Sequence, residues 1–148
     1  MNKFTHIDSN EQITMVDVGE KPTEKRYAKA TGKISLASET ISAITSLHIT
    51  KGNVLATAKI AGIQAAKKTS ELIPLCHQLI LTKIDVHLTI ISNGIIAEGE
   101  VFCTGQTGAE MEALTAVSVA LLTIYDMCKA IDKKMKIEWI NLVEKKKY

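Results

Sequence analysis

The chain has 148 residues and a mass of 16.1 kDa, which is the length of one domain that buries roughly 70% of its unfolded surface. Lysine and arginine total 18 against 16 acidic residues, and 4% of the residues are aromatic. A net charge of +2 argues against a protein that coats nucleic acid, and so few aromatic residues argue against a platform that stacks single-stranded bases. The 46% hydrophobic share is typical of a folded globule.

The cysteines and the apolar segments indicate the compartment. Cys76, Cys103 and Cys128 are too few for a disulfide framework and odd in number, which favours a reducing compartment. The first residues, MNKFTHIDSN, lack the apolar core of a signal peptide. The apolar stretch at 113–125, about 13 residues, is expected to be too short to cross a bilayer. We therefore expect a cytoplasmic protein with no membrane partner.

The hydrophobic pattern predicts an N-terminal arm at residues 1–24 and one domain at 25–148. Alternating and β-branched segments predict strands at 26–36, 79–91, 95–102 and 136–143. Helical spacing of apolar residues predicts helices at 39–47, 53–72 and 109–130. We expect Ser38 to cap the short helix, Pro74 to stop the second, and Asn93-Gly94 to form a hairpin turn with positive φ at both positions.

This order of elements predicts the fold class. Without the short helix, it is the split βαβ order of an α+β, ferredoxin-like fold, with helices packed on one face of an antiparallel sheet. The two long helices are rich in alanine, which lets helices approach closely but buries little area per residue. Packing against another copy would supplement the modest core, so we expect a homo-oligomer.

A first cluster of candidate site residues follows the second helix at Pro74-Leu75-Cys76-His77. A histidine on a loop either makes a structural hydrogen bond or contacts a ligand. Adjacent Cys and His are poor partners for one metal ion, and the sequence has no CxxC or HxxxH pair. We expect no metal site here.

A second cluster, Glu110 and Glu112, opens the third helix after the glycine loop 104–108. Acidic residues near a helix N-terminus also stabilise the helix by themselves. Residues i and i+2 do not share a helix face, so if both carboxylates act they serve different directions.

Asp126 and Lys129 form a third cluster at the other end of the same helix, at i, i+3 spacing that lets them touch. They make either an ordinary surface ion pair or a carboxylate that positions a proton-transferring amine. Glu112 and Asp126 lie about 21 Å apart along the helix, at 1.5 Å per residue. A ligand that touches both must therefore be long, or two copies must pair.

Basic residues are spread over loops and chain ends. Lys51-Gly52 precedes a helix but lacks the glycine-rich Walker pattern, so an ordinary nucleotide-hydrolysis loop is not predicted. The last twenty residues hold seven lysines against three acidic residues, a local charge of +4 that either solvates this end or forms an anion-binding rim. This pattern fits a small polyphosphate-bearing molecule. The residues therefore favour an enzyme that acts on a phosphorylated ligand. The alternatives are a scaffold that binds a nucleotide without catalysis and a metal-dependent hydrolase.

Three long runs resemble a known family. They are MVDV at 15–18, KGNVLATAKIAGIQAAKKTSELIPLCH at 51–77 and GQTGAEMEALTAVSVALLTIYDMCKA at 105–130. The chain resembles the molybdenum cofactor biosynthesis protein C family, the cyclic pyranopterin monophosphate synthases, over nearly its whole length. It departs from the family at Gln78, where the family usually has proline.

The resemblance implies a phosphorus–oxygen lyase that converts 3′,8-cyclo-7,8-dihydroguanosine 5′-triphosphate to cyclic pyranopterin monophosphate and pyrophosphate. It implies a homohexamer, a trimer of dimers, with active sites at dimer interfaces. It implies no cofactor, although Mg²⁺ can accompany the triphosphate. By the same resemblance Asp126, Lys129 and Lys51 are catalytic, and we expect the two lysines to have depressed pKa values. The implied substrate contacts are Leu75, Cys76, His77, Glu110, Met111 and Glu112, with Arg26, Lys67 and Lys145 near the phosphates.

Overall fold

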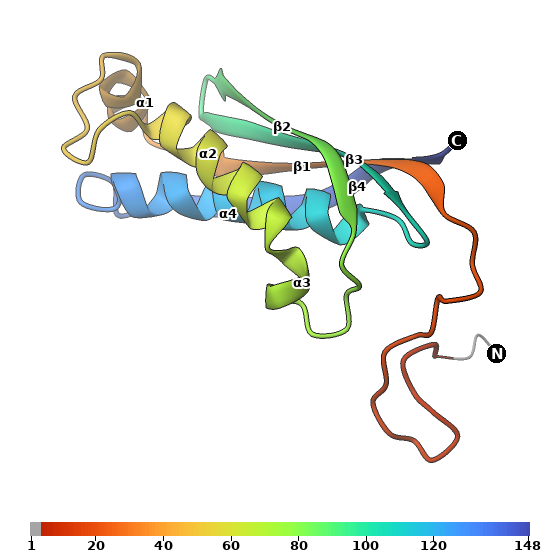
Figure 1. Cartoon of the computed structure of the whole chain (residues 1–148). Helices are drawn as coiled ribbons and strands as arrows, with labels where there is room; N and C mark the ends of the chain where they lie inside the picture. Colours follow the sequence, from red (N-terminus) through yellow and green to blue (C-terminus); the bar gives the residue numbers. More distant parts are fainter. Residues whose placement is uncertain (1–3) are drawn as a thin grey trace.

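In the computed structural model, which describes residues 4–148, four long strands form one antiparallel sheet with the helices on one face (Figure 1). The strands are β1 (Glu24–Ser35), β2 (Ile80–Ile91), β3 (Gly94–Gly105) and β4 (Lys136–Lys147). The helices are α1 (Ser38–Thr45), α2 (Val54–Lys67), α3 (Thr69–Leu72) and α4 (Glu110–Cys128). The strand order β2-β3-β1-β4 is the one that a split βαβ unit produces, so the predicted ferredoxin-like α+β fold is confirmed.

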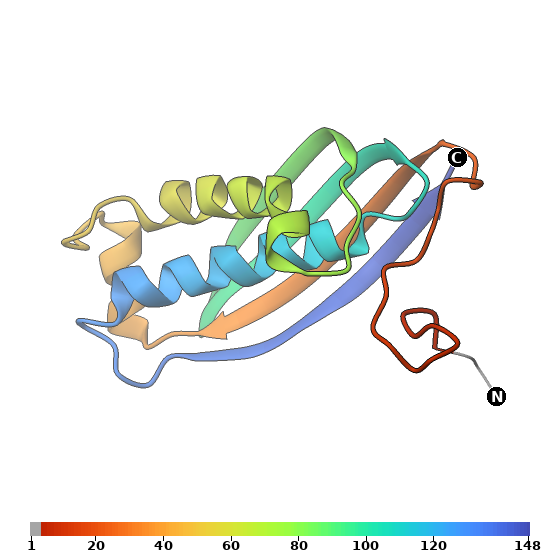
Figure 2. The same cartoon turned by 60° about the horizontal axis from the view of Figure 1, so that its bottom comes forward.

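The small residues of α2 and α4 allow the two helices to pack closely side by side over the sheet (Figure 2). A Cβ atom at Gly62 would lie 2.8 Å from the carbonyl oxygen of Ala116, so only glycine permits this approach. Ala58, Ala116 and Ala120 are fully buried. The predicted role of small residues within the chain is therefore confirmed, and it fixes how α4 lies across the sheet.

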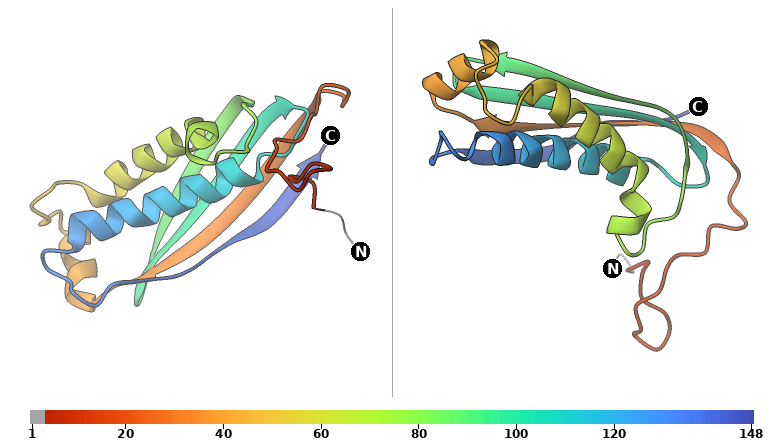
Figure 3. Two further views of the ribbon diagram at one scale, coloured as in Figure 1. Left: turned by 90° about the horizontal axis from the view of Figure 1, so that it is seen from below. Right: turned by 60° about the vertical axis from the view of Figure 1, so that its left-hand side comes forward.

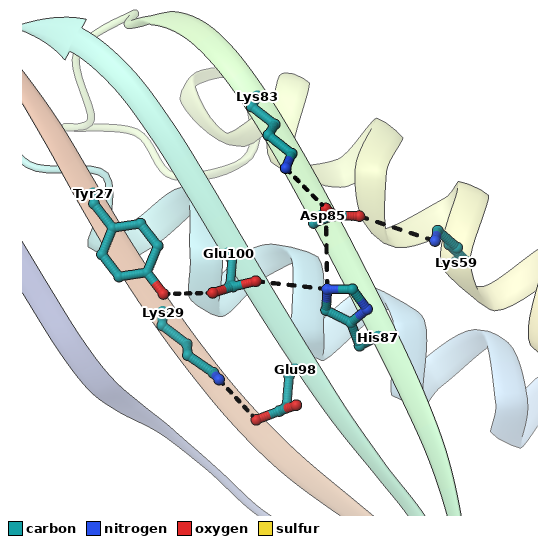
Figure 4. Close-up of polar contacts among 8 residues, drawn as sticks. All are labelled: Tyr27, Lys29, Lys59, Lys83, Asp85, His87, Glu98 and Glu100. Carbon is teal, nitrogen blue, oxygen red and sulfur yellow. Dashed lines mark hydrogen bonds and ion pairs between the residues drawn. The ribbon is translucent and has the colours of Figure 1, made fainter.

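The other face of the sheet carries paired charges, and none of the described helices covers it (Figure 4). The hydroxyl of Tyr27 donates a hydrogen bond of 2.6 Å to Glu100, whose other oxygen lies 3.5 Å from Nε2 of His87. Lys29 pairs with Glu98 at 3.0 Å. Burial, then the bond to Glu100, raises the pKa of Tyr27. These groups satisfy one another across three strands and stabilise the sheet.

The hairpin between β2 and β3 turns one residue earlier than predicted. Ile91 pairs with Gly94, so Ser92 and Asn93 are the turn residues, and neither Asn93 nor Gly94 has a positive φ. Glycine is needed at 94 for another reason, because a Cβ there would collide with the carbonyl oxygen of Ile34 on the neighbouring strand. The hairpin was predicted correctly, but its position and the role of Gly94 were wrong.

The predicted helix at 53–72 is two helices. Asn53 caps α2, because its side-chain oxygen accepts a hydrogen bond of 3.0 Å from the backbone N–H of Ala56. The chain leaves helical geometry at Lys68, where φ is −106°, and α3 then turns in a new direction (Figure 1). This turn carries the following loop, with Cys76 and His77, toward the start of α4.

Asp132 takes the capping role that we predicted for Ser38. Ala37 occupies the cap position of α1, and its backbone N–H donates a hydrogen bond of 2.9 Å to Asp132. The same carboxylate accepts bonds from the hydroxyl of Thr40 at 2.8 Å and from the backbone N–H of Lys134 at 3.0 Å. The prediction for Ser38 was wrong because a residue distant in sequence supplies the acceptor.

Helix α4 has 19 residues and is apolar enough, by length and composition, to cross a membrane. The apolar stretch at 113–125 lies within this longer helix. Half of the helix is buried inside the protein, as in the core helix of a soluble protein. Its packing between α2 and the sheet accounts for its apolar character.

The segment before β1 runs outside the sheet as an extended arm (Figure 3). Ile7 and Ile13 form one isolated antiparallel bridge, and Val18 is buried. The first three residues of the predicted arm at 1–24 lie outside the described residues. The arm leaves the body at the end of the sheet where α4 begins (Figures 1 and 3).

Candidate active site

The candidate residues gather in two groups at opposite ends of α4. The Asp126 end contains Lys51, Asp126 and Lys129. The Glu112 end contains the loop with His77, the start of α4 and the end of β4. The helical rise places Glu112 and Asp126 about 21 Å apart, so the two groups do not form one small-molecule site within a single chain.

At the Asp126 end one carboxylate holds two lysines. Asp126 accepts from Lys129 at 2.8 Å through one oxygen and from Lys51 at 2.8 Å through the other. Lys51 also donates a bond of 3.1 Å to the backbone carbonyl oxygen of Asp126. The predicted contact of Asp126 with Lys129 is confirmed, and about half of each of the three side chains is exposed.

The charges at this end fix the protonation of the group. The hydrogen bond from Lys129, then that from Lys51, lowers the pKa of Asp126 to about 2. The bond to Asp126 raises the pKa of Lys129, so the expected depression of the Lys129 pKa is wrong for this chain. A carboxylate in contact stabilises the ammonium more than its partial desolvation destabilises it. At neutral pH the pair is therefore an anion and a cation.

At the Glu112 end the two carboxylates face different directions, as their i, i+2 spacing predicts. Glu110 reaches β4 and pairs with Lys145 at 3.2 Å. Glu112 points inward and is only 4% exposed. Burial, and to a smaller extent the charge of Glu110, raises the pKa of Glu112 to about 7, against the opposing hydrogen bond from its own backbone N–H. Glu112 can therefore take up and release a proton near neutral pH.

His77 is held by the arm. Its Nε2 lies 2.6 Å from the backbone carbonyl oxygen of Val16, so this ring nitrogen is the donor of the bond. The sequence left two interpretations of His77, a structural hydrogen bond and a ligand contact. The structure is compatible with both, because the ring makes a hydrogen bond to the arm and also lines a cavity. No sequence signal indicated the role of Val16, since a backbone acceptor does not depend on residue type.

A cavity of about 320 Å³ lies between the arm and the body at this end. Leu75, Cys76, Met111 and both carboxylates line it from the body. Burial, then the charge of Glu112, raises the pKa of the Cys76 thiol, so this thiol is neutral at physiological pH. The predicted contacts at 75–77 and 110–112 therefore surround one space. The arm adds the residues that sequence reasoning missed, which are Thr5, His6, Val16, Val18 and Lys21.

The predicted phosphate contacts lie in two adjoining cavities. Arg26 and Lys145 line a space of about 270 Å³ that includes Glu110. Arg26 pairs with Glu24 at 3.1 Å and donates to the carbonyl oxygen of Gly105 at 3.4 Å. Lys67 lines a space of about 170 Å³ with Glu112. Glu110 and Glu112 therefore each line both the central cavity and one of the two spaces that hold the basic side chains.

The remaining side chains of residues 4–148 offer no cluster of three His, Cys, Asp or Glu that could hold a metal ion. The donors that face the cavities are therefore mainly single carboxylates, amines and backbone groups. This set can bind the polar edge of a heterocycle, bind phosphate and move protons.

The fold and the cavities define a ferredoxin-like α+β protein whose carboxylates and basic side chains gather at the two ends of α4. The model of the MoaC family matches residues 15–147, and the chain belongs to this family. It is 56% identical over 146 residues to a cyclic pyranopterin monophosphate synthase of Novosphingobium aromaticivorans, covering 99% of this chain and 93% of that protein. It is 52% identical over 147 residues to a protein of the same name from Chloroflexus aurantiacus, covering 98% and 90%. A molybdenum cofactor biosynthesis bifunctional protein of Chlorobaculum tepidum is 54% identical over 143 residues, or 97% of this chain and 46% of its own length.

Proposed function

We propose that this chain is a cyclic pyranopterin monophosphate synthase of molybdenum cofactor biosynthesis, acting in the cytoplasm on 3′,8-cyclo-7,8-dihydroguanosine 5′-triphosphate. The observation that carries the proposal is the pair of carboxylates with opposite proton affinities on α4, of which Glu112 lines the central cavity and a neighbouring space that Lys67 also lines. Relatives with this name cover nearly the whole chain at more than half identity, which supports the same assignment.

The reaction needs repeated proton transfers while the purine ring opens and recloses. Glu112, with a pKa of about 7, accepts and returns protons. Lys129 donates protons as an ammonium, because its contact with Asp126 keeps it charged. Lys51 stands on the other oxygen of Asp126 and supplies a second positive charge. Glu110 and the loop with Cys76 and His77 bind the donor edge of the ring.

Closure of the cyclic phosphate requires in-line attack of a sugar hydroxyl on the α-phosphorus. The hydroxyl loses its proton, the bond from the α-phosphorus to the bridging oxygen breaks, and pyrophosphate leaves as a phosphorus–oxygen lyase requires. Arg26, Lys67 and Lys145 balance the charge on the departing pyrophosphate. Any Mg²⁺ arrives with the triphosphate, and the proposal assigns no resident cofactor.

A second copy of the chain joins the two ends of α4 into one site. Glu112 and Asp126 are each seven residues from Val119, so an antiparallel α4 of another copy, crossed near Val119, sets Asp126 of one chain beside Glu112 of the other. α4 presents apolar side chains for such a contact, since Met111, Leu122 and Tyr125 are exposed. We propose that these pairs assemble further into a homohexamer, a trimer of dimers.

The experiment is complementation with assay of pyrophosphate release from the cyclised triphosphate. Lys129→Ala and Glu112→Gln chains should each be inactive alone. When they are co-expressed, about a quarter of the sites should regain both groups, since a random mixture forms mixed pairs half the time and each mixed pair has one intact site. Recovery near zero would reject the shared site. Binding of guanosine phosphates without turnover by the parent chain would instead favour a nucleotide-binding scaffold.

A further inference from the structure

The N-terminal arm exposes a cluster of apolar side chains. Phe4 and Ile13 are each 81% exposed, and Ile7 and Met15 are about half exposed. Single exposed apolar residues are ordinary on a protein surface, but four within one short segment form a patch that indicates a partner. Figure 3 shows this part of the arm standing away from the helices and the sheet.

The opposite end of the molecule also exposes apolar side chains. Leu47 and Ile131 are each more than half exposed there. This end is also basic, with Lys129, Lys133 and Lys134 in the turn after α4. In contrast, residues 4–20 of the arm contain four acidic residues and no lysine or arginine, the acidic residues being Asp8, Glu11, Asp17 and Glu20.

We infer that the arm of one copy packs over the Asp126 end of a second copy. The inference rests on the proposed antiparallel pairing of α4, which brings the Asp126 end of the second copy to the end where the first copy has its arm. The apolar side chains of the arm then meet those of the partner, and its acidic residues meet the partner's basic turn. Because the arm is acidic, an anionic membrane surface is the poorer partner.

This packing gives the arm a part in the site. The arm already lines the 320 Å³ cavity with His6, Val16 and Lys21, and His77 fixes it at Val16. An arm that extends from this wall onto the second copy closes the space between the two halves of the shared site. It also excludes water from the proton-transferring groups.

Cross-linking of the whole protein with a carbodiimide tests the inference. The reagent joins a carboxylate to an amine only when the two are in contact. α4 is about 28 Å long, at 1.5 Å per residue, and it separates the arm from the turn after α4 of the same chain. A mixture of isotope-labelled and unlabelled chains identifies the links that join two copies. We expect peptides that contain Asp8 or Glu11 joined to peptides that contain Lys133 or Lys134. Links from the arm only to its own end, such as to Lys21, would overturn the inference.

Two arm variants separate packing from folding. Ile13→Asp should weaken association of copies about tenfold in sedimentation velocity, because it places a charge in an apolar contact. Its urea midpoint should not move, since Ile13 is 81% exposed within the chain. Asn10→Asp adds the same charge to the same arm and should change association less than about twofold.

An unchanged association of Ile13→Asp would show the inference to be wrong, as would Ile13-dependent binding to phospholipid vesicles without arm-to-turn links. Pyrophosphate release measured on the same samples keeps the two proposals apart. An active oligomer without these cross-links contradicts only the arm packing, whereas cross-links without turnover contradict only the proposed activity.

Discussion

The two ends of α4 hold carboxylic acids in opposite environments. Asp126 is about half exposed, contacts two ammonium groups and has a pKa lowered to about 2. Glu112 is 4% exposed and has a pKa raised to about 7 by burial. The intrinsic pKa values of the two side chains differ by less than half a unit. Packing and neighbouring charges, not residue type, therefore set their proton affinities.

This difference indicates how the chain divides its chemistry. Asp126 stays ionised at every physiological pH and can only orient its lysines and stabilise their charge. Glu112 changes protonation near pH 7 and can act as acid or base. Two titratable groups whose environments push their pKa values apart are the pattern that assigns acid and base roles in enzymes.

The largest expected effect comes from removing a cation at the Asp126 end. Lys129→Ala should lower the rate of pyrophosphate release about 10⁴-fold, because it removes a proton donor and a stabilising charge together. Substrate affinity and the mass of the assembly should change little, as isothermal calorimetry and light scattering can check. Lys136→Ala is the matched control, since Lys136 is an exposed lysine that pairs with Glu138 at 3.7 Å and lies outside the site. Near-normal turnover of Lys129→Ala would remove the assignment.

At the other end, Glu112→Gln should lower the rate about 10³-fold, since the amide keeps the shape but cannot carry a proton. The rate of the parent enzyme should rise with pH through about 7 as Glu112 ionises, and this limb should vanish in the variant. Glu110→Gln should raise KM while keeping the limb. If Glu112→Gln retains the same limb, another group is the base.

Much of the fold was predictable from the sequence because local signals agreed with the global arrangement. The alternation of apolar and polar residues predicted the four strands. Small residues such as Gly62 and Ala116 predicted that the two long helices pack closely. Asn93-Gly94 shows where local signals fail. The dipeptide predicts a hairpin. Glycine is required at 94, however, because a side chain there would collide with Ile34 of another strand, and no local sequence pattern indicates this contact. Asp132 replaced Ser38 as the cap of α1 for the same kind of reason.

Some contacts among the candidate residues were predictable from the sequence, but their electrostatics were not. The i, i+2 spacing indicated that Glu110 and Glu112 diverge, and the i, i+3 spacing indicated the contact of Asp126 with Lys129. The predicted direction of the Lys129 pKa shift was wrong. This direction depends on whether burial of the ammonium or its contact with a carboxylate has the larger effect. The arm residues around His77 were missed, since Val16 acts through its backbone.

Glu112 should also oppose folding at high pH, which extends the comparison to stability. Its pKa is raised in the folded state, so its contribution to stability is fully present below about pH 4.5 and is lost as pH rises through about 7. The loss amounts to about 3 kcal/mol by pH 8. Glu112→Gln should therefore be more stable than the parent at pH 8, in urea unfolding, and should lack this pH dependence. If raising the pH to 8 destabilised Glu112→Gln as much as the parent, Glu112 would not be buried as an ion at that pH.

Asp132 is a third carboxylate, and it tests whether burial alone raises a pKa. It is 6% exposed, as buried as Glu112, and burial does raise its pKa, but the bonds from Ala37, Lys134 and Thr40 together outweigh this and lower it. Its contribution to stability is present above an unfolded pKa near 3.8 and is lost as pH falls through the lower folded value. Asp132→Asn should cost about 2 kcal/mol at pH 7 in urea unfolding, since it removes charge-assisted bonds and turns donors toward donors. Asp17→Asn alters only an exposed hydrogen bond from the backbone N–H of Gly19, so it should lower the free energy of unfolding by only a small fraction of that amount. Equal effects of the two variants would mean that the bonds to Asp132 stabilise the fold no more than one exposed bond does.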